Sequence, residues 1–212
     1  MNVHTRPFTL DGAAGALECA LDAPDATECP NPRGIALIAH PHPLYGGTMD
    51  NKVAQTLARA FVSIGYVAVR MNFRGVGASA GVHDEGRGET DDMALLHAHM
   101  TQRYPGMPVA LAGFSFGTFV QAQLQQRLDA AGTPAERLVL VGCAAGKWAM
   151  PAVPSNTILI HGEVDDTIPL TAVLDWARPQ DLPVIVIPGA DHFFHRKLQH
   201  IKNLLVEMWR RG

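Results

Sequence analysis

The apolar residues of this chain gather into short, unbroken runs instead of alternating with polar residues. The runs are rich in valine and isoleucine, which is typical of strands covered on both faces of a sheet. They lie at residues 35–39, 66–71, 109–113, 138–142, 157–160 and 183–187. The pattern therefore predicts six buried strands in a mostly parallel sheet.

Amphipathic segments separate these runs. Val53, Leu57 and Phe61, for example, recur at helical spacing. Helices are predicted near residues 50–64, 91–104, 120–132, 170–177 and 195–211. Because strands alternate with helices, we expect an α/β fold with helices on both faces of the sheet, in one domain spanning residues 1–212. Two further strands, near 8–10 and 16–21, are expected to add an antiparallel edge.

Composition limits the class of protein. The chain has 212 residues, of which 47% are hydrophobic and 17% charged, and this fits one soluble globular domain. The formal net charge of -3 gives no electrostatic reason to bind nucleic acid or an anionic membrane. Three widely spaced cysteines favour neither a disulfide framework nor a thiolate metal site. With no signal-peptide pattern and no apolar run of about 20 residues, we expect a cytoplasmic protein; its oligomeric state is left open.

A short motif after the strand predicted at 109–113 carries the first chemical signal. Gly113-Phe114-Ser115-Phe116-Gly117 is a G-x-S-x-G sequence between a strand and a helix. In such an elbow the glycines let strand and helix approach closely, and the serine hydroxyl is exposed at the turn. The helix N-terminus behind it favours developing negative charge. We therefore predict a nucleophilic Ser115; the alternative is a serine that only caps the helix.

A nucleophilic serine needs a base, and the base needs a carboxylate that holds it in the correct tautomer. After this type of elbow, the acid precedes the histidine in the chain. Glu163, Asp165 and Asp166 follow the strand predicted at 157–160. Asp165 is the predicted acid, because its place in G-E-x-D-x-x-I-P matches the usual acid loop. Asp166 is the alternative and otherwise a helix cap, and Glu163 is interpreted as a structural residue.

The predicted base is His192, which lies in the loop after the strand at 183–187. His195 is the alternative, but it falls at the start of the last predicted helix. Asp191 is interpreted as a cap or a loop ligand. We expect His161 to pack beneath the acid loop, whereas His83 shows no pattern with other functional groups.

The first parallel strand leads into residues 41–52, where a second oxyanion donor is expected. The first donor is predicted to be the backbone N–H of Phe116. Because two residues of the loop are prolines without an N–H, the second donor is His42 or Leu44, and we favour His42. The side chains predicted to contact the substrate are those of Leu44, Tyr45 and Trp148.

Two other patterns are typical of bound groups, but their context does not support them. His40 and His42 have the spacing of a metal pair, yet no carboxylate or thiol lies alongside. Gly75, Gly77 and Ala80 satisfy the loose dinucleotide fingerprint, but a glycine-rich stretch without apolar period follows where a helix should open. We therefore expect no metal and no cofactor, and we interpret the turn as a close-packed frame of the site.

Taken together, the motifs resemble those of the small lidless serine α/β-hydrolases, a group related to dienelactone hydrolases and often labelled carboxylesterases. The matching stretches are HPHPLYGGTMDNK, RMNFRGVGASAG, GRGETDD, GFSFGTF, HGEVDDTIP and GADHFF, spread from residue 40 to 194. The resemblance implies the α/β-hydrolase fold, a Ser115–His192–Asp165 triad and an accessible site. The first thirty residues carry no matching motif.

The segment between Gly142 and Thr157 is too short to form a cap domain, which agrees with an open site. We therefore expect a serine hydrolase that cleaves small carboxylic esters through an acyl-enzyme. A thioesterase, a lactone hydrolase or a small-peptide hydrolase would use the same triad. The alternative from another class is a binding protein that keeps the fold without catalysis.

Overall fold

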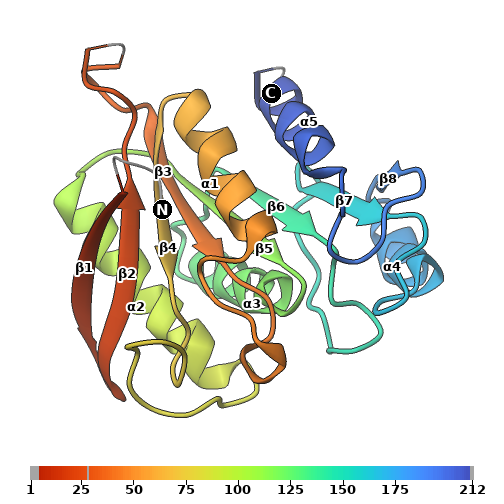
Figure 1. The fold of residues 1–212 in the computed structure, drawn as a ribbon, viewed down its shortest axis with the longest axis horizontal. Coiled ribbons are helices and arrows are strands. Elements are labelled where there is room, and N and C mark those ends of the chain that lie inside the picture. Colours follow the sequence, from red (N-terminus) through yellow and green to blue (C-terminus); the bar gives the residue numbers. More distant parts are fainter. Residues whose placement is uncertain (1–4, 28, 211–212) are drawn as a thin grey trace.

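The computed structural model describes residues 5–27 and 29–210, which are built around an eight-stranded sheet (Figure 1). The strands lie in the order β1-β2-β4-β3-β5-β6-β7-β8. β1 pairs with β2 and β2 with β4 in antiparallel fashion, and the remaining pairs are parallel. The strands are β1 (Thr5–Gly12), β2 (Gly15–Asp22), β3 (Gly34–Ala39), β4 (Tyr66–Met71), β5 (Val109–Phe114), β6 (Arg137–Val141), β7 (Ile158–Gly162) and β8 (Ile185–Ile187). The mostly parallel sheet and its antiparallel edge confirm the predicted fold class.

Helices cover both faces of the sheet (Figure 1). Alternate residues of the strands point to opposite faces, so Ile35 and Leu37 of β3 join one apolar cluster and Ala36 and Ile38 join the other. On the first face lie α2 (Arg87–Arg103), α3 (Phe116–Ala130) and α4 (Leu170–Ala177). On the second lie α1 (Lys52–Ser63) and α5 (Leu198–Arg210). Two short 3-10 helices are η1 (Pro43–Tyr45) and η2 (Arg178–Gln180).

Three helices begin several residues from their predicted starts, and one of them is α3, which begins at Phe116 directly after Ser115. α2 begins before residue 91, because Gly86 has a left-handed φ of 91° and its N–H donates to the Glu89 side chain, which caps the helix. α5 begins after residue 195, because Phe194 and Arg196 have φ values of 53° and 60°, which a helix does not accommodate. Residue 211, the last of the helix predicted at 195–211, lies outside the described residues.

The segment between β6 and β7 is fully described and contains neither a helix nor a strand, only an isolated bridge between Ala145 and Trp148. No cap domain is inserted there, as the sequence predicted. In the described part of the chain, every helix is too short or too polar to span a membrane.

Candidate active site

Loops at the carboxyl ends of β5, β7 and β8 bring Ser115, Asp165 and His192 together, because the ends of parallel strands meet at one edge of a sheet. The Oγ of Ser115 lies 2.9 Å from Nε2 of His192, and Nδ1 of His192 lies 2.7 Å from Oδ2 of Asp165. All three residues are more than nine-tenths buried. Hydroxyl, imidazole and carboxylate therefore form the continuous hydrogen-bonded chain that the sequence predicted.

The turn at Ser115 has a strained backbone, with φ 54° and ψ -122°. Its carbonyl accepts hydrogen bonds from the N–H and the hydroxyl of Thr118, at 2.8 and 2.6 Å. A Cβ on Gly113 would lie 2.4 Å from the carbonyl oxygen of Gly117, and one on Gly117 would lie 2.4 Å from the carbonyl oxygen of Ala39. Close contact between strand and helix therefore requires glycine at both flanking positions of the elbow.

The Asp165 carboxylate is held by its own loop. Its Oδ1 accepts the backbone N–H groups of Thr167 and Ile168, at 2.9 and 2.7 Å, which leaves Oδ2 for His192. Burial alone raises the pKa of Asp165, but hydrogen bonds from His192 and Ile168 and the nearby imidazoles outweigh burial, so the pKa lies below its ordinary value. Because an ionised carboxylate only accepts, Nδ1 of His192 carries the hydrogen and Nε2 is free to accept the serine proton.

His161 lies fully buried beneath the acid loop, as predicted. Its Nε2 lies 2.9 Å from the carbonyl oxygen of Ile168 and 3.4 Å from Oδ2 of Asp165. Because a carbonyl oxygen only accepts, Nε2 carries a hydrogen. Burial is the main cause that lowers the pKa of His161, so the ring is neutral near neutral pH and supports the acid loop through hydrogen bonding.

A cavity of about 550 Å³ opens at Ser115. Its walls include the rings of Tyr45, Phe116, Trp148 and Phe193. Tyr45 and Trp148, two residues predicted to contact the substrate, are thus part of this wall. Leu44, the third residue predicted to contact the substrate, was wrongly placed: it is exposed and does not belong to the cavity wall, whereas Tyr45 of the same 3-10 helix η1 does.

His42 and Phe116 both line this cavity. Phe116 is the first residue of α3, so its N–H has no carbonyl one turn earlier to which it can donate. The N–H of Leu44, the alternative oxyanion donor, instead donates to Nδ1 of His42 at 3.2 Å. The ring of His42 packs against that of Phe116, with centroids 4.8 Å apart. Burial first, and then the neighbouring His83, lowers the pKa of His42, so its ring is neutral near neutral pH.

A model of the serine aminopeptidase S33 family matches residues 30–195, which is most of the chain. The protein belongs to this family of α/β-hydrolases. A lidless α/β serine hydrolase from Xanthomonas campestris has a similar structure, with a TM-score of 0.91, 33% identity, and coverage of 100% of this chain and 96% of that one. Family and fold together identify a serine hydrolase and confirm the resemblance seen in the motifs.

Two further proteins are similar to this chain in sequence. An uncharacterised protein of Rickettsia prowazekii is 31% identical over 185 residues, covering 81% of this chain and 76% of that protein. Lysophosphatidylserine lipase ABHD12 of Danio rerio is 36% identical over 106 residues, but these cover 48% of this chain and only 28% of the lipase.

The alternative acid does not join the hydrogen-bonded chain of this hydrolase. Asp166 is exposed, and its carboxylate accepts from the hydroxyl of Thr167. The interpretation of Asp166 as a helix cap was wrong, because α4 follows Pro169 without any side-chain capping bond. Pro169 itself occupies the N-cap position, with the φ of -57° that its ring imposes.

The alternative base is also separate from the serine. His195 is exposed, and its backbone N–H and its ring both bond the carboxylate of Asp191, which is the loop ligand predicted for that residue. Glu163 accepts the N–H of Gly189 at 2.7 Å, so it ties the acid loop to the histidine loop and has the structural position expected of it.

His40 is fully buried and uses both ring nitrogens within the protein. Nδ1 lies 2.6 Å from the carbonyl oxygen of Pro41, and Nε2 accepts the N–H of Phe73 at 2.9 Å. Neither nitrogen is free, so His40 has no lone pair to share with His42 in a metal pair. Its role is to join the end of β3 to the loop after β4.

We expect His40 to make folding sensitive to acid. Burial is the main cause that lowers its pKa from 6.5 to about 4. Between these values the unfolded chain takes up a proton that the folded chain does not, so stability falls as the pH is lowered. The expected loss in the free energy of unfolding is about 2 kcal/mol between roughly pH 7 and pH 5. Urea unfolding at both pH values measures it. His40→Gln keeps a donor and an acceptor but does not titrate, so its free energy of unfolding should fall less between the two pH values than that of the parent. Equal falls in the two proteins would show that His40 is not the cause of the acid sensitivity.

The glycine-rich turn after β4 is closely packed, as predicted. A Cβ on Gly77 would lie 2.5 Å from a carboxylate oxygen of Glu18 and 2.6 Å from the amide nitrogen of Asn72. The next helix, α2, begins only at Arg87, so no helix N-terminus opens at the turn to receive a phosphate.

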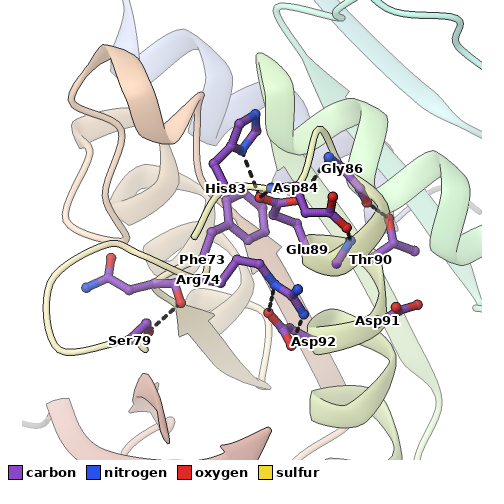
Figure 2. A network of polar contacts seen from close by, with 12 residues as sticks. Phe73, Arg74, Ser79, His83, Asp84, Gly86, Glu89, Thr90, Asp91 and Asp92 are labelled. Carbon is purple, nitrogen blue, oxygen red and sulfur yellow. Dashed lines mark hydrogen bonds and ion pairs between the residues drawn. The ribbon is translucent and has the colours of Figure 1, made fainter. Parts of the chain in front are cut away.

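The first turn of α2 and the loop before it carry a polar network that was not predicted from the sequence (Figure 2). Glu89 is fully buried and accepts hydrogen bonds from Nδ1 of His83 at 2.8 Å, from the N–H of Asp84 at 2.9 Å and from the N–H of Gly86 at 2.8 Å. The spacing of Gly86 and Glu89 is that of a capping box, a signal that points to Glu89. It contains no information about His83, for which the sequence showed no partner.

Proposed function

We propose that the protein hydrolyses small carboxylic esters, with Ser115 as nucleophile, His192 as general base and Asp165 as the carboxylate that orients the base. The observation that carries the proposal is the unbroken chain of two hydrogen bonds, 2.9 and 2.7 Å long, that ends in a serine hydroxyl on the wall of an open cavity. A serine hydroxyl becomes an effective nucleophile only when a base is in reach of its proton, and that condition is met here.

In the proposed reaction, Oγ of Ser115 attacks the ester carbonyl while its proton passes to Nε2 of His192. The tetrahedral oxyanion accepts hydrogen bonds from the N–H groups of Phe116 and His42. The carbon–oxygen bond to the alcohol then breaks, and His192 returns the proton to the leaving alkoxide. Water attacks the acyl-enzyme by the same route, which releases the acid and restores the serine. Asp165 stays ionised throughout and stabilises the imidazolium.

The cavity supports a small, uncharged acyl group rather than a free amino terminus. Aromatic rings form much of the wall, and they suit apolar groups. Among the described residues that line the cavity there is no aspartate or glutamate that would hold an ammonium group, and Lys147 lies on the wall instead. An aminopeptidase substrate would therefore bring its cation into a site without a counter-charge.

A substrate panel tests this choice. We expect the highest kcat/KM for p-nitrophenyl acetate and butyrate, with lower values for the octanoate and palmitate esters. Leucine p-nitroanilide, an acetyl thioester, a lactone and lysophosphatidylserine serve as comparisons for the peptidase, thioesterase, lactonase and lysophospholipase reactions. Preferred hydrolysis of any of these four would overturn the proposed ester specificity while leaving the serine mechanism in place.

Labelling separates an enzyme from a binding protein of the same fold. A fluorophosphonate should modify Ser115, and peptide mapping by mass spectrometry identifies the modified residue. An unmodified Ser115 in folded protein would contradict its role as an activated nucleophile.

A further inference from the structure

His83 lies directly behind the two residues that supply the proposed oxyanion donors. Its ring centroid is 4.7 Å from that of His42 and 5.4 Å from that of Phe116. His83 does not line the cavity, so it has no contact through which to act on a substrate itself. Any influence it has on the reaction must pass through the rings on which it packs.

The orientation of the His83 ring is set by a buried carboxylate. Nδ1 of His83 lies 2.8 Å from Oε1 of Glu89, and the side chain of Glu89 is 0% exposed. Because a carboxylate only accepts, Nδ1 carries the hydrogen of this bond. Rotation of the ring would break the bond and leave a buried carboxylate short of a partner, which is costly. The bond to Glu89 therefore holds the ring in the orientation in which it packs on His42 and Phe116.

The helix that carries Glu89 is tied to the loop after β4 (Figure 2). The guanidinium of Arg74, in the loop after β4, bonds both carboxylate oxygens of Asp92 at 2.8 Å. The same guanidinium packs on Gly88, where a Cβ would lie 2.0 Å from one of its nitrogens. The first two turns of α2 are thereby joined to the loop after β4, and Glu89, the partner of His83, lies between these two contacts in the chain.

The His42 ring has further contacts within the protein. Its ring packs on Tyr45 and Trp148, with centroids 4.8 and 5.7 Å away. Its carbonyl accepts the N–H groups of Tyr45 and Gly47 at 3.2 and 3.0 Å. A small displacement of an oxyanion donor weakens its hydrogen bond to the oxyanion, which is strongest in the transition state. A contact that prevents such a displacement therefore raises kcat and has little effect on substrate binding.

We propose that Glu89 and His83 form a positioning pair, which holds His42 and Phe116 so that their backbone N–H groups point at the oxyanion. The pair is made of positioning residues and takes no part in proton transfer. This inference rests on the proposed function, because it gives the two N–H groups their role in ester hydrolysis.

Three variants test the pair: His83→Ala removes ring and hydrogen bond, His83→Phe keeps a ring without the bond to Glu89, and His200→Ala changes an exposed histidine of α5 as a control. With p-nitrophenyl acetate, we expect His83→Ala to lower kcat about tenfold, a part of the loss known for removing a donor outright, with KM changed by less than about twofold. His83→Phe should fall between His83→Ala and the parent, and His200→Ala should match the parent.

Amide hydrogen exchange of His42, Tyr45 and Gly47 provides a readout that needs no turnover. Exchange should be faster in His83→Ala than in the parent and His200→Ala, at a temperature where thermal melts show all proteins folded. If His83→Ala does not fold, the same comparison is made with His83→Phe. An unchanged kcat, a loss confined to KM, or unchanged exchange would each overturn the positioning role. A parent enzyme that hydrolyses no ester would instead contradict the proposed function, and the exchange rates would still decide whether His83 holds the loop.

Discussion

Ser115→Ala is expected to lower kcat for the best ester by roughly 10⁶-fold, by analogy with a serine protease that has lost its nucleophile. The physical reason is that, among the residues that the structure describes, His192 has no other hydroxyl within hydrogen-bond distance to activate. Steady-state rates with p-nitrophenyl acetate, corrected for the uncatalysed reaction, measure the loss.

Folding should be little affected by this change. Alanine has a Cβ like serine, so the strain of φ 54° at this position is the same in parent and variant. Ser63→Ala, on α1 and outside the cavity wall, is a matched control that should keep full activity. A Ser115→Ala protein that is folded and as active as the parent would end the proposed mechanism.

Asp165→Asn is expected to lower kcat by roughly 10⁴-fold, as in a protease triad with the same change. The amide oxygen should replace Oδ1, because the N–H groups of Thr167 and Ile168 require an acceptor there. The amide NH₂ then faces Nδ1 of His192, which can accept its hydrogen only when the ring proton lies on Nε2. In that tautomer Nε2 no longer accepts the proton of Ser115.

Asp166→Asn is the matched control, since it makes the same chemical change one residue away on an exposed side chain. We expect it to retain parental kcat and KM. If Asp166→Asn is the damaging change and Asp165→Asn is not, the assignment of the acid is wrong. Fluorophosphonate labelling of both variants shows whether a lost rate reflects a less activated serine, since Asp165→Asn should also react slowly.

The sequence predicted some parts of the site well, because their signals are local. The elbow around Ser115 combines a strand, two glycines and a helix within a few residues, and the structure shows that both glycines are required by backbone contacts. The acid and histidine loops could be located because each follows an apolar strand. The choice between Asp165 and Asp166 rested on a motif, and their different hydrogen bonds appear only in the fold.

Other residues of the site could not be placed from the sequence, because no pattern near them in the chain indicated their contacts. Leu44 was expected to contact the substrate, but in the fold only its neighbour Tyr45 lines the cavity, although both residues belong to the 3-10 helix η1. His83 lies in a glycine-rich stretch with no apolar period, so nothing near it in the chain indicated its contact with His42. That contact depends on how the loop before α2 packs against the loop after β3.

The sequence by itself determined the class of fold, the order of the strands and helices along the chain, and which hydroxyl, carboxylate and imidazole stand at strand ends. These follow from side-chain periodicity and turn chemistry, which act over a few residues. The tertiary structure alone decided that Asp165 rather than Asp166 meets His192, and that a buried Glu89 orients a histidine behind the cavity. Such contacts join residues far apart in the chain, and only the packing of the loops against one another brings them within bonding distance.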